Sequence, residues 1–158
     1  MRVEEIEEKI IYGISTRTKN ANEMHPETAK IAAIWQKFDS TVEVNYKDDE
    51  KVYGVYYNYE SDANGEFDVL AGYKTSHDKL DTVKIQKGKY LVFNKTFENT
   101  DDNTRIQAII ETWGNIWEYF SNESSQYKRM YKTDFEYYKD PYEIEIYISI
   151  SISEKTFG

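Results

Sequence analysis

Two stretches of the chain carry apolar residues at the three- and four-residue spacing of an amphipathic helix. The first has one apolar face made of Ile31, Ile34, Trp35 and Phe38. Pro26 lies just before it and is expected in the first helical turn. The second has a longer face made of Ile106, Ile109, Ile110, Trp113, Trp117 and Phe120. The pattern predicts two helices, each of which needs an apolar surface to cover.

Six other stretches are rich in β-branched and aromatic residues, which is typical of strands. They lie at 6–18, 52–59, 67–73, 83–93, 132–138 and 142–150. Gly88 interrupts the fourth stretch, and a bulge or a turn is expected at Lys87-Gly88. In the last stretch isoleucines alternate with polar residues, which predicts one buried face. The order of predicted elements is β-α-β-β in each half of the chain.

The two halves also share residues at a constant spacing. Ile-Trp-x-x-Phe occurs at 34–38 and at 116–120, so the offset from Trp35 to Trp117 is 82 residues. The same offset links Tyr53 to Phe135, within equivalent predicted strands. The alternative is that two amphipathic helices merely look alike. We favour duplication, and predict one α+β domain over 1–158, in which halves at about 1–78 and 79–158 are related by a pseudo-twofold axis and form an antiparallel sheet.

Composition excludes several classes of function. The chain of 158 residues has 20 basic and 29 acidic residues and a net charge of −9, which argues against non-specific nucleic-acid binding and against docking on an anionic membrane. It contains no Cys and two widely separated His, so disulfides, thiolate chemistry and a His-rich metal centre are not expected. No targeting or membrane-spanning segment is visible, and the cytoplasm is the expected location. We expect no cofactor.

The aromatic content is high, with 15 Tyr, 7 Phe and 3 Trp, and suggests that tyrosine faces are used. Trp35 and Trp117 belong to the repeated motif and are interpreted as core residues, whereas Trp113 is less clearly so. Among the tyrosines on predicted strands, Tyr56 and Tyr90 are candidates for the wall of a binding site. Several other strand tyrosines are expected to be ordinary sheet-surface residues.

Enzymatic motifs are scarce in this sequence. It has no Gly-rich phosphate loop and no G-x-S-x-G elbow, and its two His lie in polar stretches. The acidic runs at 48–50 and 101–102 are interpreted as solvated charges or helix-terminus partners. No residue pattern identifies a reaction.

Glu136 is the acid with the most informative surroundings, because it lies within the aromatic stretch 133–138. Strand alternation places Phe135 and Tyr137 on one face and Asp134, Glu136 and Tyr138 on the other. The pattern alone favours a solvent-facing Glu136, since glutamate is seldom buried. The alternative places Glu136 at the floor of an aromatic cavity, where its charge and the ring faces would favour a lipophilic cation.

Taken together, several segments resemble the gyrase-inhibitor-like small-molecule-binding domains, which are also the effector-binding domains of multidrug-sensing bacterial transcription activators. The segments are 113–120, 134–138 and 142–150, with support from 53–57 and 88–90. The resemblance covers nearly the whole chain. It implies a pseudo-twofold domain with a central ligand pocket, and no DNA-binding domain is expected here. The chain is therefore similar to free-standing members, including cationic-drug-binding proteins of mobile gene cassettes.

The resemblance also implies site residues. It carries the pocket acid onto Glu136, a tyrosine that opens the last strand onto Tyr142, and a further aromatic onto Phe97. Together with the pattern, the expected ligand-binding residues are Glu136, Tyr142, Trp113, Phe97, Tyr90, Tyr56 and Trp117. No catalytic or metal-ligating residue is expected.

Three functions remain open at this point. The first is a module that binds lipophilic, mainly cationic aromatic small molecules, working alone, as a homodimer or with a separate regulatory protein. The second is a small-molecule hydrolase of the same family in which Glu136 activates water. The third is an acidic protein-interaction module. The first is preferred, without direct binding to nucleic acid or membrane.

Overall fold

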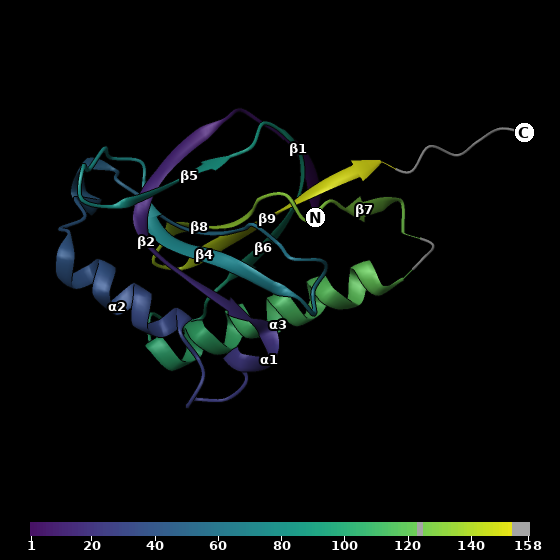
Figure 1. Ribbon diagram of the computed structural model, residues 1–158, viewed down its shortest axis with the longest axis horizontal. Helices are drawn as coiled ribbons and strands as arrows, with labels where there is room; N and C mark the ends of the chain where they lie inside the picture. Colours follow the sequence, from purple (N-terminus) through teal and green to yellow (C-terminus); the bar gives the residue numbers. More distant parts are fainter. Residues whose placement is uncertain (123–124, 153–158) are drawn as a thin grey trace, which may run out of the picture.

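A curled antiparallel sheet forms the framework, and two helices pack on one of its faces (Figure 1). The computed structural model describes residues 1–122 and 125–152, so the last six residues of the predicted domain range lie outside the described part. The elements in that part are β1 (Arg2–Ile6), β2 (Lys9–Lys19), α1 (Asn20–Glu23), α2 (Ile31–Thr41), a 3-10 turn η1 (Tyr46–Asp48), β3 (Val52–Tyr57), β4 (Glu66–Tyr73), β5 (Asp81–Ile85), β6 (Gly88–Thr96), α3 (Asp102–Ser121), β7 (Tyr127–Arg129), β8 (Asp134–Asp140) and β9 (Glu143–Ile152). None of the helices in these residues is long and apolar enough to cross a membrane. The α+β class predicted from the sequence is confirmed.

The strand order is symmetric about the middle of the sheet. It runs β1-β6-β9-β8-β3-β4-β2-β5, and β7 pairs with β9 outside this path. β8 and β3 lie side by side at the centre, flanked by β9 and β4. The outer strands are exchanged, because β1 from the start of the chain pairs with β6, while β5 pairs with β2. Each half of the sheet therefore ends on a strand that comes from the other half of the sequence.

The offset of 82 residues has a direct structural counterpart at the centre of the sheet. It links Gly54 on β3 to Glu136 on β8, and the antiparallel register pairs these same two residues. It also links Tyr56 to Tyr138, which lie on either side of that pair. An antiparallel pair has a local twofold axis between its strands. The pseudo-twofold axis implied by the repeat therefore passes between Gly54 and Glu136.

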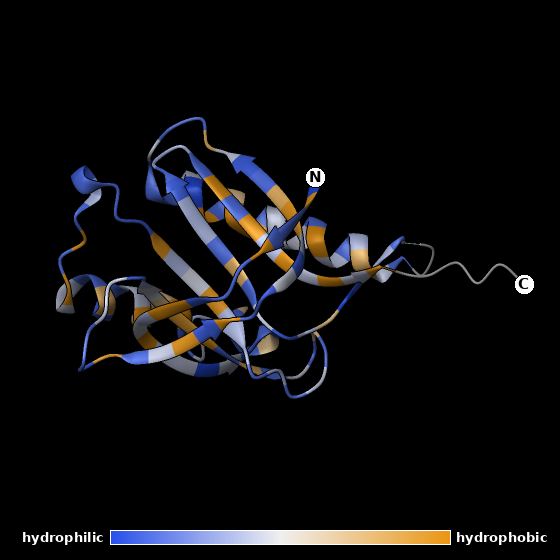
Figure 2. Ribbon diagram, turned by 90° about the horizontal axis from the view of Figure 1, so that it is seen from above, coloured by the Kyte–Doolittle hydropathy of each residue, from blue (hydrophilic) through white to orange (hydrophobic). Residues whose placement is uncertain are grey.

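Strand alternation separates the core into layers. The face without helices holds one cluster, which includes Tyr53, Val55, Phe135 and Tyr147. The helix face holds two clusters, one under α3 and one under α2. Figure 2 shows the alternating apolar and polar bands along the strands that produce this division. The two helix-face clusters flank β8 and β3, which positions a site on the axis between the helices.

Two predicted boundaries were wrong, and one predicted interruption is confirmed. α2 begins at Ile31 and not at Pro26, which lies in a turn where the amide of Ala29 donates to the carbonyl of His25. The α2 amino terminus is capped from a distance, because the Glu23 carboxylate accepts from the amide of Ile31 at 3.0 Å. The predicted strand 6–18 corresponds to β2, which begins only at Lys9, because Ile6 belongs to β1. The stretch 83–93 divides into β5 and β6, and this interruption agrees with the bulge or turn expected at Lys87-Gly88.

Candidate functional site

Glu136 lies near the pseudo-twofold axis, on the helix face of β8. Its position follows from alternation, because Phe135 before it and Tyr137 after it pack on the opposite face. The residue is 3% exposed, so the interpretation of Glu136 as a surface acid is wrong. The sequence pattern identified its face but not its burial, which depends on the packing of α2 and α3.

Three side chains from three elements hold the Glu136 carboxylate. The Trp113 Nε1–H of α3 donates to Oε2 at 2.8 Å, and the Tyr56 hydroxyl of β3 donates to the same oxygen at 3.0 Å. The Tyr138 hydroxyl of β8 donates to Oε1 at 3.0 Å. Tyr56 and Tyr138 are the pair related by the 82-residue offset. Thus both symmetry-related tyrosines donate to one carboxylate near the axis.

Gly54 provides the space that this carboxylate occupies. A Cβ at position 54 would lie 2.6 Å from Glu136 Oε1 and 3.3 Å from Trp35 Cζ2. A contact of 2.6 Å is too close for any side chain to tolerate without movement. A Cβ opposite Glu136 would therefore force its carboxylate, which three hydrogen bonds hold in place, to shift.

Aromatic rings surround the carboxylate from both helices. The rings of Trp35 and Tyr138 meet edge to face, with centroids 5.2 Å apart, and those of Tyr56 and Trp113 do the same at 5.1 Å. Trp117 follows Trp113 at a centroid distance of 6.4 Å. These separations lie in the favourable range for aromatic pairs. We call these five rings, Trp35, Tyr56, Trp113, Trp117 and Tyr138, the aromatic cluster.

The electrostatic state of Glu136 is set by opposing effects. Burial raises the pKa of its carboxyl above the ordinary value, and the hydrogen bonds from Trp113, Tyr56 and Tyr138 act in the opposite direction. Burial, with the nearby Glu136 charge, also raises the pKa of the Tyr56 and Tyr138 hydroxyls well above their usual range, so both remain donors. Among the described residues, no basic side chain forms an ion pair with Glu136. The carboxylate is solvated by neutral donors alone.

A second buried carboxylate on the same face, Asp134, has a different partner. Its Oδ2 accepts from Arg129 of β7 at 2.9 Å and from the Tyr59 hydroxyl at 2.6 Å. Burial alone would lower the pKa of the Arg129 guanidinium, but Asp134, together with Tyr59 and Tyr131, outweighs this effect, so the pKa is raised. Sequence analysis missed this pair. Alternation placed Asp134 beside Glu136, but no sequence signal connects it to Arg129 across the turn at Tyr131.

The structure brings four of the predicted site residues together. Glu136, Tyr56 and Trp113 are hydrogen bonded, and Trp117 packs beside Trp113. Trp117 is 36% exposed, so its interpretation as a core residue was wrong. Trp35 is partly buried and packs against the α2 cluster.

Three other predicted residues lie elsewhere. Tyr90 is buried on the opposite face, where its ring meets Phe135 and its hydroxyl donates to the Gln86 carbonyl at 2.6 Å. Tyr142 is 56% exposed and lies in the turn between β8 and β9, outside the paired strands. Phe97 lies just after the end of β6 and is buried beside α3.

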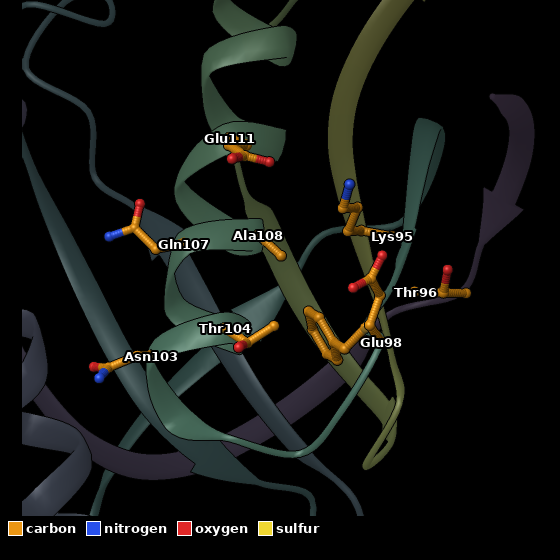
Figure 3. Close-up of a pocket in the computed structure, with 9 residues that line it drawn as sticks. Lys95, Thr96, Glu98, Asn103, Thr104, Gln107, Ala108 and Glu111 are labelled. Carbon is orange, nitrogen blue, oxygen red and sulfur yellow. The ribbon is translucent and has the colours of Figure 1, made fainter.

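Phe97 belongs to a separate cavity. This cavity has a volume of about 610 Å³ and lies between α3 and the end of β6 (Figure 3). Polar side chains of Lys95, Glu98 and Glu111 point toward it from both sides. A second, smaller cavity lies beside Gly88. Neither of these two cavities is lined by Glu136.

Comparison with known proteins shows which effector-binding proteins this arrangement resembles. The family model described as Cass2, integron-associated effector binding protein, matches residues 2–150. An integron cassette protein from the mobile metagenome of Vibrio cholerae, VCH_CASS2, superposes with a TM-score of 0.80 at 38% identity and covers 95% of both chains. The YobU protein of Bacillus subtilis (strain 168), named "Putative transcriptional regulator protein", is 27% identical over 135 residues, which are 80% of this chain and 78% of YobU.

A third relative was solved with a ligand. SAV2435 bound to tetraphenylphosphonium superposes with a TM-score of 0.61 at 18% identity, over 95% of this chain and 93% of that chain. At this identity the match shows a shared fold and nothing about shared site residues.

Proposed function

This chain belongs to the family of integron-associated effector-binding proteins, and we propose that its effector is a lipophilic aromatic cation bound at Glu136. One observation carries the proposal. Glu136 is buried, yet among the described residues its carboxylate is hydrogen bonded only to the neutral donors Trp113, Tyr56 and Tyr138. A buried carboxylate without a counter-ion is costly, and a bound cation reduces that cost.

The surroundings of Glu136 favour an aromatic cation over a compact, hydrated one. The faces of indole and phenol rings attract cations, and the attraction is largest where water is excluded. The aromatic cluster also supplies apolar area for aryl groups on the ligand. A small metal ion would instead need several oxygen ligands, whereas three of the groups on Glu136 are hydrogen-bond donors.

The ligand in this proposal enters between α2 and α3 and displaces part of the aromatic cluster. Glu136 is 3% exposed and lines neither described cavity, so in this proposal the space for the ligand comes from side-chain movement. Trp117 and Trp113 are well placed for this, since Trp117 is partly exposed and the two indoles are neighbours on α3. When the Trp113 indole turns away, Glu136 Oε2 keeps the Tyr56 hydrogen bond and gains an open side for the cation.

The relatives support both the ligand class and the biological role in this proposal. SAV2435 shares the fold and was solved with tetraphenylphosphonium, which is an aromatic monocation. YobU is named as a transcriptional regulator. The proposed role of this chain is that of a module that binds or senses a drug.

Titration of the protein with tetraphenylphosphonium and with neutral triphenylphosphine oxide tests the proposal. Both probes carry aryl groups on phosphorus, but only the first is charged. Calorimetry is expected to show at least about tenfold tighter binding of the cation. Equal affinities for the two probes would refute a charge-selective site at Glu136.

A further inference from the structure

The protein already holds one cation in an aromatic cage, and that cation is its own Arg129. The Arg129 side chain is 6% exposed, and its guanidinium carbon lies 4.5 Å from the ring centre of Tyr131, 5.7 Å from that of Tyr59 and 5.9 Å from that of Trp113. Asp134, whose side chain is fully buried, supplies the counter-ion at 2.9 Å. Three rings and one carboxylate around a delocalised cation form a complete cation-binding site.

This cage shares a wall with the Glu136 site. Trp113 donates its Nε1–H to Glu136 and also lies beneath the Arg129 guanidinium. Asp134 and Glu136 are two residues apart on β8, so their side chains lie next to each other on the same face of the sheet. The two carboxylates differ in compensation, because Asp134 has Arg129 whereas Glu136 has only neutral donors within the part of the chain that the structure describes. One uncompensated negative charge remains, and it is that of Glu136.

We infer that Arg129 restricts the Glu136 site to ligands that carry a single positive charge. The inference rests on the proposed binding of aromatic cations at Glu136 and adds the charge class of the ligand. A first positive charge is neutralised by Glu136. A second one finds no free carboxylate, since Asp134 is held by Arg129 and by the Tyr59 hydroxyl.

Repulsion strengthens this restriction. A second ligand charge would lie near the Arg129 guanidinium, inside a region from which water is largely excluded, where like charges repel more strongly than in water. Arg105 on α3 lies over the Phe97 ring at 5.6 Å, and its positive charge also reaches Tyr138. Positive charge on the protein therefore lies beside Trp113 and near Tyr138, two of the side chains that donate to the Glu136 carboxylate.

A series of probes with one shape and different charge tests the inference. Methyl viologen carries two positive charges, and 1-methyl-4-(p-tolyl)pyridinium has the same two-ring frame with one. For the wild-type protein, calorimetry is expected to give at least about tenfold tighter binding of the monocation. Binding of the dication within about threefold of the monocation would overturn the inference.

Variants of Arg129 identify the cause of the preference. Arg129→Gln leaves Asp134 without its counter-ion, so the preference for the monocation is expected to fall by at least about tenfold. Arg129→Lys keeps the positive charge and is the matched control, which should retain the preference. An unchanged preference in folded Arg129→Gln would overturn the inference.

The double variant Arg129→Gln/Asp134→Asn covers the case in which Arg129→Gln fails to fold. It removes both buried charges together, so the site keeps the same net charge as in the wild type. The Arg129 repulsion and the Asp134 attraction are lost together and Glu136 is again the one uncompensated charge, so the monocation preference should stay within about threefold of the wild type, and a fall of about tenfold or more would overturn the inference. The proposed function is read out separately, because it fails only if wild-type protein binds tetraphenylphosphonium no better than triphenylphosphine oxide.

Discussion

Replacing Glu136 by glutamine removes one charge from the site and little else. The amide can fit the same hydrogen-bond arrangement, with its oxygen accepting from Trp113 and Tyr56 as Oε2 does in the native protein. Its NH₂ group would then face the Tyr138 hydroxyl, which can turn from donor to acceptor. The fold should therefore persist, and the carboxylate charge that burial disfavours is gone.

The loss of affinity can be estimated from Coulomb's law. Aryl groups keep a phosphonium centre about 5 Å from a carboxylate oxygen, and at an effective dielectric constant of about 20 the attraction is then about 3 kcal/mol. Part of this attraction offsets the desolvation of both charges, so a net loss of about 2–3 kcal/mol is expected for Glu136→Gln. That corresponds to about 30- to 150-fold weaker binding of tetraphenylphosphonium.

Calorimetry on Glu136→Gln, wild type and Glu145→Gln provides the test. Glu145 is a matched control because it is also 3% exposed, but it pairs with Arg2 and lies with Tyr147 on the opposite face. Only Glu136→Gln should lose cation affinity, and its binding of neutral triphenylphosphine oxide should not change. The reasoning is refuted if Glu136→Gln binds the cation within about threefold of wild type, or if it loses both probes equally.

Three further outcomes are expected. Gly54→Ala should destabilise the fold by about 1–3 kcal/mol in urea unfolding, because its Cβ would lie 2.6 Å from the Glu136 carboxylate; an unchanged midpoint would show that the site yields more easily than its packing suggests. Cation affinity should fall as the pH drops through the raised pKa of Glu136, and Tyr138→Phe, which removes a hydrogen bond that lowers this pKa, should move the midpoint of binding to higher pH. By linkage, the ligand-free protein should lose stability as the pH rises through the same pKa, because burial disfavours the charged carboxylate. Both pH effects should be absent in Glu136→Gln. Tyr90→Phe should cost about 1 kcal/mol of stability and leave cation affinity unchanged, since Tyr90 lies on the opposite face; a binding defect measured by calorimetry would place the ligand elsewhere.

The parts of the fold that were predictable are those set by local periodicity. The apolar faces of 31–38 and 106–120 identified both major helices, and alternation assigned Phe135 and Glu136 to the correct faces. Asp101 caps α3 through the amide of Thr104, as the polar run before that helix indicated. These features depend on neighbours a few residues apart, which a single sequence displays directly.

The remaining features depend on pairings between distant segments. Tyr90 and Tyr56 both lie on aromatic strands, but only the sheet register decides which of them shares a face with Glu136. The Arg129–Asp134 pair forms because the chain turns at Tyr131, which has a φ of 53°, and that turn has no distinctive residue such as glycine. One missed residue was within reach, since the 82-residue offset applied to Glu136 leads directly to Gly54.

The location of Glu136 on the pseudo-twofold axis limits how far the two halves of this protein can resemble each other. Two identical halves would place either two glutamates or two glycines at positions 54 and 136, which face each other across β3 and β8. Two glutamates would collide and repel, and two glycines would leave no acid at all. A fully symmetric version of this fold, or a homodimer of one half, therefore cannot contain the same site. The difference between Gly54 and Glu136 makes room for a single carboxylate, and hence for one ligand per chain.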